Sequence, residues 1–349
     1  MKSKKIAILS LPCNPNYGFV LQQWALYSFL KWNNYSVVLL NRRWNRINGS
    51  WLDKLKTFLF LHVFCHPFYS FWKKMAHSPE IRSSNNMRSF VKKNGIDTVV
   101  VGSDQVWRIE NTRGADLNFF GDFLDGLNVK KISYAPSFGR DDWKGTEEET
   151  KSIKRLLNSF DSVSVRERDG LSLCKEIFSV EAKLVLDPTM LLCVDEYKKL
   201  LKKKKRNKNY VATYILDATN EKNEFIAKIA AGRPIVPLIK ENRIMSNMSI
   251  EDWLTEIYFA DYVVVDSFHG MVFSILFEKE FCAIANKRRG ISRFTSLLSV
   301  LNLDNRLIYD LSLPEQITSQ KKIAYDDVNS RLNALREDSR SFLLNALEN

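Results

Sequence analysis

Residues 6–32 read IAILSLPCNPNYGFVLQQWALYSFLKW, and this stretch indicates the fold class. The apolar run Ile6–Leu11 has the length and composition of a buried β-strand, and the turn residues PCNPNYG end it. From Phe19 to Trp32, apolar residues recur at helical spacing. A strand, a loop and a helix in this order predict an α/β protein.

The same pattern is repeated along the rest of the chain, where each predicted strand is a short apolar run that stops at a polar or glycine-bearing loop. In the first half of the chain these strands are Val37–Leu40, Thr98–Gly102, Lys131–Tyr134, Ser162–Val165 and Leu184–Leu186. In the second half they are Tyr210–Leu216, Ile235–Leu238, Tyr262–Val265 and Phe281–Ile284. Because ligands of doubly wound sheets bind beyond the carboxyl ends of the strands, the polar residues at those ends are the first site candidates.

The length of the chain, 349 residues, exceeds what a single hydrophobic core usually supports, so we expect two domains. The charged stretch Lys198–Asn209 marks their boundary. The first domain is predicted over 1–197, with an aromatic-rich insertion at 51–78, and the second over 198–349. A closing helix is expected at Tyr325–Leu347, where apolar residues again recur at near-helical spacing.

The chain carries a net charge of +12, which favours an acidic partner. Six of the seven residues from Lys202 to Lys208 are basic, and such a run is typical of a solvated loop. No zinc-finger spacing, helix-turn-helix pattern or RNA-binding aromatic signature accompanies the charge, so we expect no nucleic-acid partner. The five cysteines lack CxxC spacing and the first strand is too short for a signal peptide, which favours a cytoplasmic protein with reduced thiols.

The stretch Trp51–Trp72 is rich in aromatic residues and is flanked by lysines at positions 54, 56, 73 and 74. Its uncharged part, about 16 residues long, is shorter than the about 20 residues that a bilayer-spanning helix needs. Two interpretations are open. The segment forms helices that cover the sheet or close a cleft, or it is an interfacial segment that lies on a membrane surface.

Two loops of the first domain carry candidate ligand-binding groups. In NPNYGFVLQQ, Asn16 and Gly18 open a helix whose free backbone N–H groups could hold an anion, although a tight turn explains these residues equally well. In VVGSDQVW, Ser103 and Asp104 directly follow a buried strand. A carboxylate at this place serves either a ligand or the start of a helix.

The segment SVRERDG places Arg166 and Arg168 two residues apart after another apolar strand. In an extended segment both side chains would point the same way. Arginine is suited to bidentate contact with phosphate or carboxylate, so this pair predicts an anion site. A structural salt bridge from one of the two to Glu167 or Asp169 is the alternative.

The most specific pattern is YVVVDSFHG, in which Ser267, His269 and Gly270 open an apolar helix directly after a strand. Histidine in this place can act as a general acid or base near neutral pH, whereas a purely structural histidine is the alternative. The later segment NKRRGISRF clusters Arg288, Arg289 and Arg293. That cluster fits phosphate binding or solvated charge.

Several well-known motifs are absent from the sequence. It contains no Walker loop, no GxGxxG, no HExxH and no GxSxG. Their absence argues against nucleotide hydrolysis, dinucleotide-dependent redox chemistry and the familiar hydrolases. The chemistry that the sequence still supports is anion binding by arginines together with one histidine.

Seven segments, taken in chain order, resemble the polysaccharide pyruvyl transferase family. The likeness is collinear over about residues 6–310, and its segments are LPCNPNYGFVLQQWAL, VVGSDQVW, KKISYAPSFG, SVRERDG, VLDPTMLL, VDSFHGMVFSILF and NKRRGISRFTSLLSVLNL. The resemblance implies two Rossmann-like domains facing a cleft, similar to the B-type glycosyltransferase fold. It also implies transfer of a pyruvyl group from phosphoenolpyruvate to a sugar of a cell-surface glycan, forming a ketal.

The resemblance further implies roles for single residues. His269 matches the histidine of the family's Arg-x-His-Gly motif, and Arg166 matches the arginine after the last strand of the first domain. Ser267 stands where that motif carries arginine. Either Arg168 or the basic cluster of residues 288, 289 and 293 then supplies the missing charge, or the donor differs.

These inferences together predict a transferase that is cytoplasmic, either free in the cytoplasm or at the inner face of the membrane. Its expected partners are phosphoenolpyruvate and a glycan acceptor, free or lipid-linked, and no metal or organic cofactor is required. Two other functions fit the same sequence: a B-type glycosyltransferase that uses a nucleotide sugar, and a non-catalytic protein that binds a glycan or an anion.

Overall fold

A computed structural model of the chain describes residues 4–44, 58–203, 209–239, 248–286, 290–312, 317 and 320–349. The chain divides into two compact units, unit 1 with residues 1–192 and 335–349, and unit 2 with residues 193–334. The sequence prediction placed the boundary five residues later and assigned all of 198–349 to the second domain. Residues 335–349 instead group with unit 1, because long-range packing against that unit, which the local sequence pattern does not reveal, decides the grouping.

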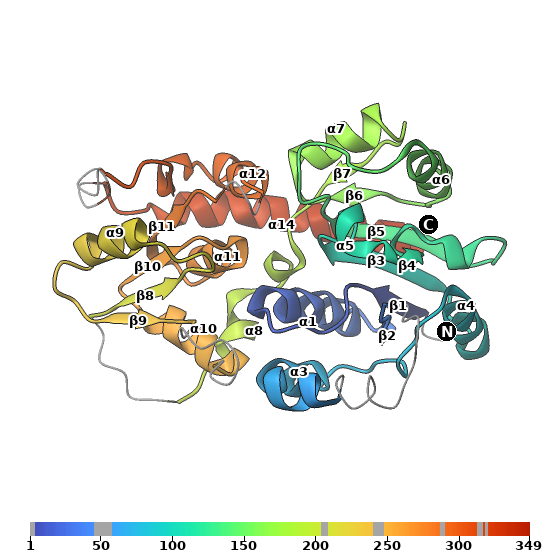
Figure 1. Ribbon diagram of the computed structural model, residues 1–349, viewed down its shortest axis with the longest axis horizontal. Helices are drawn as coiled ribbons and strands as arrows, with labels where there is room; N and C mark the ends of the chain where they lie inside the picture. Colours follow the sequence, from blue (N-terminus) through green and yellow to red (C-terminus); the bar gives the residue numbers. More distant parts are fainter. Residues whose placement is uncertain are drawn as a thin grey trace. The chain divides into compact units, whose positions relative to one another are not determined.

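Unit 1 is built on a four-stranded parallel sheet in the order β2-β1-β3-β5 (Figure 1). Its strands are β1 (Lys5–Leu9), β2 (Ser36–Leu40), β3 (Thr98–Asp104) and β5 (Lys130–Pro136). In β1 and β3 almost every residue is buried, as expected for strands of a parallel sheet that is covered on both faces. A separate parallel pair is formed by β6 (Ser164–Val165) and β7 (Lys183–Leu184), and a short β4 (Gly114–Leu117) was not predicted.

The helices of unit 1 begin with α1 (Tyr17–Trp32), which contacts β2 and β3 and buries 12 of its 16 residues. The others are α3 (His66–Trp72), α4 (Ser84–Asn94), α5 (Ile109–Thr112), α6 (Glu147–Leu157) and α7 (Arg168–Glu176), with short turns η2 (Asn118–Phe120), η3 (Asp122–Leu124) and η4 (Pro188–Met190). Local sequence signals set several of their ends. Thr146 and Glu149 form a capping box at the start of α6, and Gly95 takes the left-handed conformation after α4.

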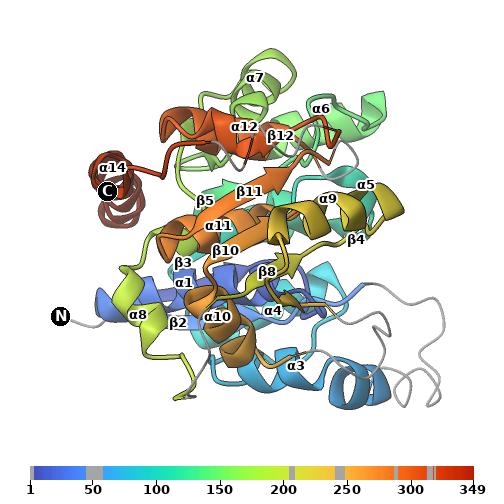
Figure 2. The ribbon, with the colours of Figure 1, turned by 90° about the vertical axis from the view of Figure 1, so that its left-hand side faces the viewer.

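Unit 2 contains a five-stranded parallel sheet in the order β12-β11-β10-β8-β9, and Figure 2 labels all of these strands except β9. Its strands are β8 (Val211–Tyr214), β9 (Ile235–Pro237), β10 (Tyr262–Val265), β11 (Glu280–Ile284) and β12 (Leu307–Ile308). Its helices are α8 (Val194–Lys198), α9 (Asn220–Ala230), α10 (Ile250–Phe259), α11 (Phe268–Leu276) and α12 (Ser292–Val300), with the turn η6 (Asp304–Arg306). Every residue of α11 is buried, which explains why its sequence is apolar on all sides.

The last helix, α14 (Tyr325–Glu348), begins in unit 2 and ends in unit 1. The closing helix and the strands that the sequence predicts are confirmed within a few residues. The four-stranded and the five-stranded sheet are both parallel, as expected for an α/β protein. Strand β12 escaped prediction because two residues carry no periodicity.

Part of the aromatic-rich insertion, residues 51–57, lies outside the described residues. The rest forms a π-helical turn η1 (Phe60–Phe64) followed by α3. Helix α3 packs on α1, where the rings of Tyr17 and Phe68 lie 4.7 Å apart. Among the described helices, none is long and apolar enough to span a bilayer.

Candidate active site

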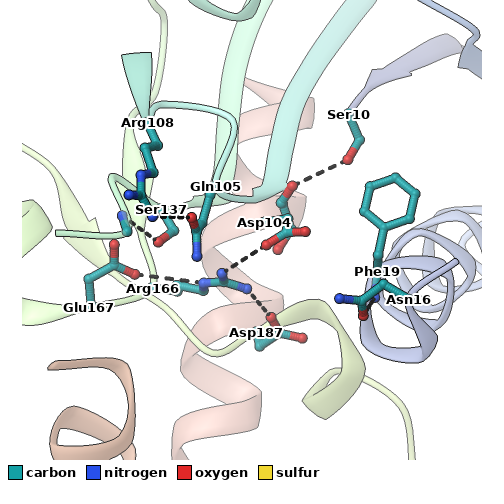
Figure 3. Close-up of polar contacts among 12 residues, drawn as sticks. Ser10, Asn16, Phe19, Asp104, Gln105, Arg108, Ser137, Arg166, Glu167 and Asp187 are labelled. Carbon is teal, nitrogen blue, oxygen red and sulfur yellow. Dashed lines mark hydrogen bonds and ion pairs between the residues drawn. The ribbon is translucent and has the colours of Figure 1, made fainter. Parts of the chain in front are cut away.

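The carboxyl ends of the unit 1 strands bring together loops that are far apart in the sequence. Strands β1, β3 and β5 are parallel neighbours, so the residues that follow them meet at one edge of the sheet. The hydroxyl of Ser10, after β1, donates a hydrogen bond of 3.2 Å to the carbonyl oxygen of Ser103, at the end of β3 (Figure 3). This edge is where the sequence predicted ligand-binding groups.

The end of β3 has an unusual backbone. Asp104 has a φ of 75° and Ala135, on the neighbouring strand, a φ of 56°, a region that costs a non-glycine residue roughly 1–2 kcal/mol. A side chain at Gly102 would place its Cβ 2.0 Å from the carbonyl oxygen of Tyr134, so only glycine fits there. Such conformations concentrate at functional sites, and this one presents Asp104 at the sheet edge with its side chain 18% exposed.

Ser103 is 2% exposed, and its hydroxyl has no hydrogen-bond partner in the part of the chain that the structure describes. Buried hydroxyls are almost always paired. Ser103 and Asp104 therefore remain candidates for contact with a ligand, as the sequence predicted.

Arg166 is the centre of a buried charge cluster. Its Nη1 lies 2.8 Å from Oδ2 of Asp187, its Nη2 lies 3.3 Å from Oδ1 of Asp104, and its Nε lies 3.7 Å from Oε2 of Glu167 (Figure 3). The guanidinium has no exposed surface. Burial by itself lowers the pKa of Arg166, but the three neighbouring carboxylates outweigh that effect and raise it, so the side chain stays charged.

The carboxylates of this cluster are themselves held in place. Asp187 accepts hydrogen bonds from the backbone N–H and the hydroxyl of Thr189, at 3.0 and 2.7 Å, and Glu167 accepts one from the N–H of Phe138 at 3.0 Å. Three carboxylates around one guanidinium give a formal charge of −2. The charge of Arg166 is thus taken up by the protein.

The predicted pairing of Arg166 with Arg168 is wrong. Strand β6 ends at Val165, Glu167 is still extended, and helix α7 begins at Arg168, so the extended conformation stops before the second arginine. Arg166 is buried while Arg168 is exposed on the first turn of the helix. The alternation argument fails because the chain changes from strand to helix between them.

Asn16 has a clear structural role. Its side-chain oxygen accepts a hydrogen bond of 3.1 Å from the N–H of Phe19 and so caps α1 (Figure 3). Gly18 is buried in the first turn of the helix. The capping bond occupies one of the free N–H groups with which this helix start could hold an anion.

Two residues of unit 1 were not considered from the sequence. Gln22 of α1 is fully buried, and neither atom of its amide has a hydrogen-bond partner within the described ranges. Arg43 follows β2 near Cys13; burial is the main cause that lowers its pKa, and its Nε likewise has no partner among the described residues. The dipeptide of two arginines after the apolar run VVLL marks a strand end and could have indicated Arg43.

In unit 2 the aspartate of the DSFHG segment is structural. Asp266 is fully buried and accepts hydrogen bonds from the N–H groups of Leu216 and Asp217, at 2.6 and 3.1 Å. Nζ of Lys222 lies 2.7 Å from it. The carboxylate therefore joins the end of β10 to the loop after β8 and to α9.

His269 is the second residue of α11 and is 6% exposed. Ser267, just before the helix, is 8% exposed and its hydroxyl makes no capping bond. The guanidinium of Arg293 lies 5.7 Å from the centre of the Phe268 ring, which also contacts the ring of His269. The structure thus brings Arg293 to the segment Ser267–His269, while Arg288 and Arg289 lie outside the described residues.

Gly270 has a packing reason to be glycine. A Cβ at this position would lie 2.9 Å from Cγ1 of Val265 and 3.0 Å from Cδ1 of Tyr214. The missing side chain lets α11 start close against β10 and β8 and so positions the residues before it.

Comparison with solved structures relates the whole fold to two kinds of sugar-nucleotide protein. The structure of UGT89C1 from Arabidopsis thaliana complexed with UDP-L-rhamnose is 10% identical, with a TM-score of 0.53, over 97% of this chain and 94% of that chain. The UDP-GlcNAc 2-epimerase from Methanocaldococcus jannaschii is 12% identical, with a TM-score of 0.53, over 92% and 94%. At such identities the likeness concerns the fold alone, and it confirms two Rossmann-like domains similar to those of B-type glycosyltransferases.

Comparison with curated protein sequences gives no match. The profile of one protein family, described as polysaccharide pyruvyl transferase, matches residues 16–288. This range is well over half of the chain and includes α1, the Asp104 and Arg166 segments and the DSFHG segment. The chain belongs to the polysaccharide pyruvyl transferase family, which is a family of enzymes.

Proposed function

We propose that this protein transfers a pyruvyl group from phosphoenolpyruvate to a sugar of a cell-surface polysaccharide, or of its lipid-linked precursor, and forms a ketal. The observation that carries the proposal is the family match over residues 16–288. Cys13, Cys65, Cys174 and Cys282 are buried free thiols, which fits work in the cytoplasm.

The reaction needs one group that both donates and accepts a proton, and we assign this role to His269. Protonation of the methylene carbon of phosphoenolpyruvate develops positive charge at the carbon that bears the phosphate. One sugar hydroxyl attacks that carbon, and the bond from the same carbon to the phosphate oxygen breaks. A neighbouring hydroxyl of the sugar then bonds to this carbon and closes the ketal. The histidine gives one proton to the methylene carbon and takes one back from the first sugar hydroxyl. The proton of the second hydroxyl leaves with phosphate. A single histidine, protonated again at the end, is therefore sufficient.

The charges of unit 1 favour the sugar as the ligand of its sheet edge. The cluster around Arg166 has a formal charge of −2, which repels an anion such as phosphoenolpyruvate. Carboxylates accept hydrogen bonds from sugar hydroxyls. We therefore assign Asp104, together with the hydroxyl of Ser103, to the acceptor, and Arg166 to the positioning of Asp104.

The anionic donor then requires cations elsewhere, and Arg293 beside Phe268 is the described candidate. Arg288 and Arg289 are proposed as its companions, on their sequence position alone. With Ser267 in place of the family's arginine, these residues carry the phosphate and the carboxylate of the donor.

A phosphate-release assay with phosphoenolpyruvate and a panel of free and lipid-linked saccharides tests the proposal. Release of phosphate that depends on a saccharide, together with a product heavier by one pyruvyl ketal, is expected. Calorimetric titration adds a second readout. If the protein binds uridine diphosphate and does not bind phosphoenolpyruvate, the proposal is wrong and a nucleotide-sugar transferase takes its place.

A further inference from the structure

The segment just before α3 exposes a group of large apolar side chains that we call the apolar tip. Its members and their exposed fractions are Phe58 (56%), Leu59 (43%), Phe60 (42%) and Val63 (45%). In the described structure, seven large hydrophobic residues are exposed, and four of them are in this stretch of six residues. Scattered exposed apolar residues are ordinary, but a group of this kind marks an interaction surface.

The tip stands on a firmly packed base. Helix α3 buries Phe68, Phe71 and Trp72, each at most 3% exposed. Nε1 of Trp72 donates a hydrogen bond of 2.9 Å to the side-chain oxygen of Gln23 in α1. Helix α3, which follows the tip, is thus fixed to the core of unit 1.

A row of ring contacts connects the tip to a cation. The rings of Phe58 and His62 lie 4.2 Å apart, and those of His62 and Tyr69 lie 5.0 Å apart. Nζ of Lys73 lies 5.5 Å from the centre of the Tyr69 ring. Lys73 and the adjacent Lys74 are exposed, so positive charge lies beside the apolar surface.

This combination fits an anionic bilayer better than a protein partner. Lysine is depleted at protein interfaces. At a bilayer surface, aromatic and aliphatic side chains enter the boundary of the acyl chains, while lysines beside them meet lipid phosphates. Each lysine near an anionic surface contributes about 1 kcal/mol, and the net charge of +12 adds long-range attraction.

We propose that the apolar tip, together with Lys73 and Lys74, docks the protein on the surface of an anionic membrane. The proposal goes beyond the transfer reaction and holds whichever donor the enzyme uses. A lipid-linked acceptor would then meet the enzyme at the same surface.

Co-sedimentation with vesicles tests this docking. One set of vesicles consists of phosphatidylcholine alone and the other of phosphatidylcholine and phosphatidylglycerol in equal parts. We expect binding to the anionic vesicles that weakens as salt is raised. The double variant F58S/F60S should bind at least about 10-fold more weakly, because two rings no longer enter the boundary. K73E/K74E should lose at least about 10-fold on anionic vesicles.

The matched control is Tyr309→Ser, which removes an aromatic side chain that is 64% exposed in unit 2 and should bind vesicles as the wild type does. The circular dichroism spectrum and the urea unfolding midpoint of F58S/F60S are measured in parallel and should match the wild type, which shows that the variant is folded. If the wild type binds neither kind of vesicle, or if the tip variant binds as tightly as the control, the docking proposal is wrong. A tip variant that only converts a dimer into a monomer would also overturn it, in favour of a second copy of the chain.

Discussion

Replacement of Arg166 by methionine should destabilise the protein strongly. The substitution keeps much of the side-chain volume and removes a guanidinium that contacts three carboxylates, two of which, Asp187 and Glu167, are at most 2% exposed in their side chains. Removal of one partner from a buried ion pair typically costs about 3–5 kcal/mol, since the other charge is left uncompensated. We expect a loss of unfolding free energy in this range at pH 7.

The matched control is Arg155→Met. Nη1 of Arg155 lies 2.9 Å from Oδ2 of Asp125, but its side chain is 65% exposed and that of Asp125 is 37% exposed. Exposed pairs contribute roughly 0.2–1 kcal/mol, so this variant should stay close to the wild type.

Urea unfolding followed by tryptophan fluorescence measures both variants. Equal urea midpoints for the two variants would refute the assignment of Arg166 to a buried structural cluster. So would a stable Arg166→Met protein that merely binds phosphoenolpyruvate more weakly, since that result is expected of a direct donor contact.

Three further predictions concern unit 2. His269→Ala should lower phosphate release by at least about 100-fold and leave the circular dichroism spectrum unchanged; wild-type turnover would remove the histidine from the mechanism. Ser267→Arg introduces the arginine that the family resemblance implies at this position. It should tighten phosphoenolpyruvate binding roughly 10-fold in a calorimetric titration, because a charge-assisted contact contributes about 1.5–3 kcal/mol; weaker binding would mean that the site is shaped for another ligand. Gly270→Ala should cost about 1–3 kcal/mol in urea unfolding, because its Cβ would lie 2.9 Å from Val265 and 3.0 Å from Tyr214, and a stability equal to the wild type would contradict the packing reason.

Local sequence patterns were enough to locate the described strands other than β4 and β12, and the residues that follow them. The apolar runs before Ser103 and Ser267 are such patterns, and they are visible in a single sequence because a buried parallel strand must be apolar throughout. The residues at the carboxyl ends of those strands are therefore site candidates on the strength of the sequence alone. The place of His269 at the start of a buried helix also followed from its neighbours in the chain.

Tertiary packing determined what the charged side chains do. Arg166 was expected to hold an anion, but its partners Asp187 and Asp104 are 21 and 62 residues away along the chain, and only the sheet order brings them together. Arg168 does not pair with Arg166, because a helix begins at Arg168. Residues 335–349 belong to unit 1, because they pack against segments of that unit that are far away in the sequence. Periodicity encodes whether a residue is buried, whereas the partner that compensates a buried charge depends on which segments the fold places side by side.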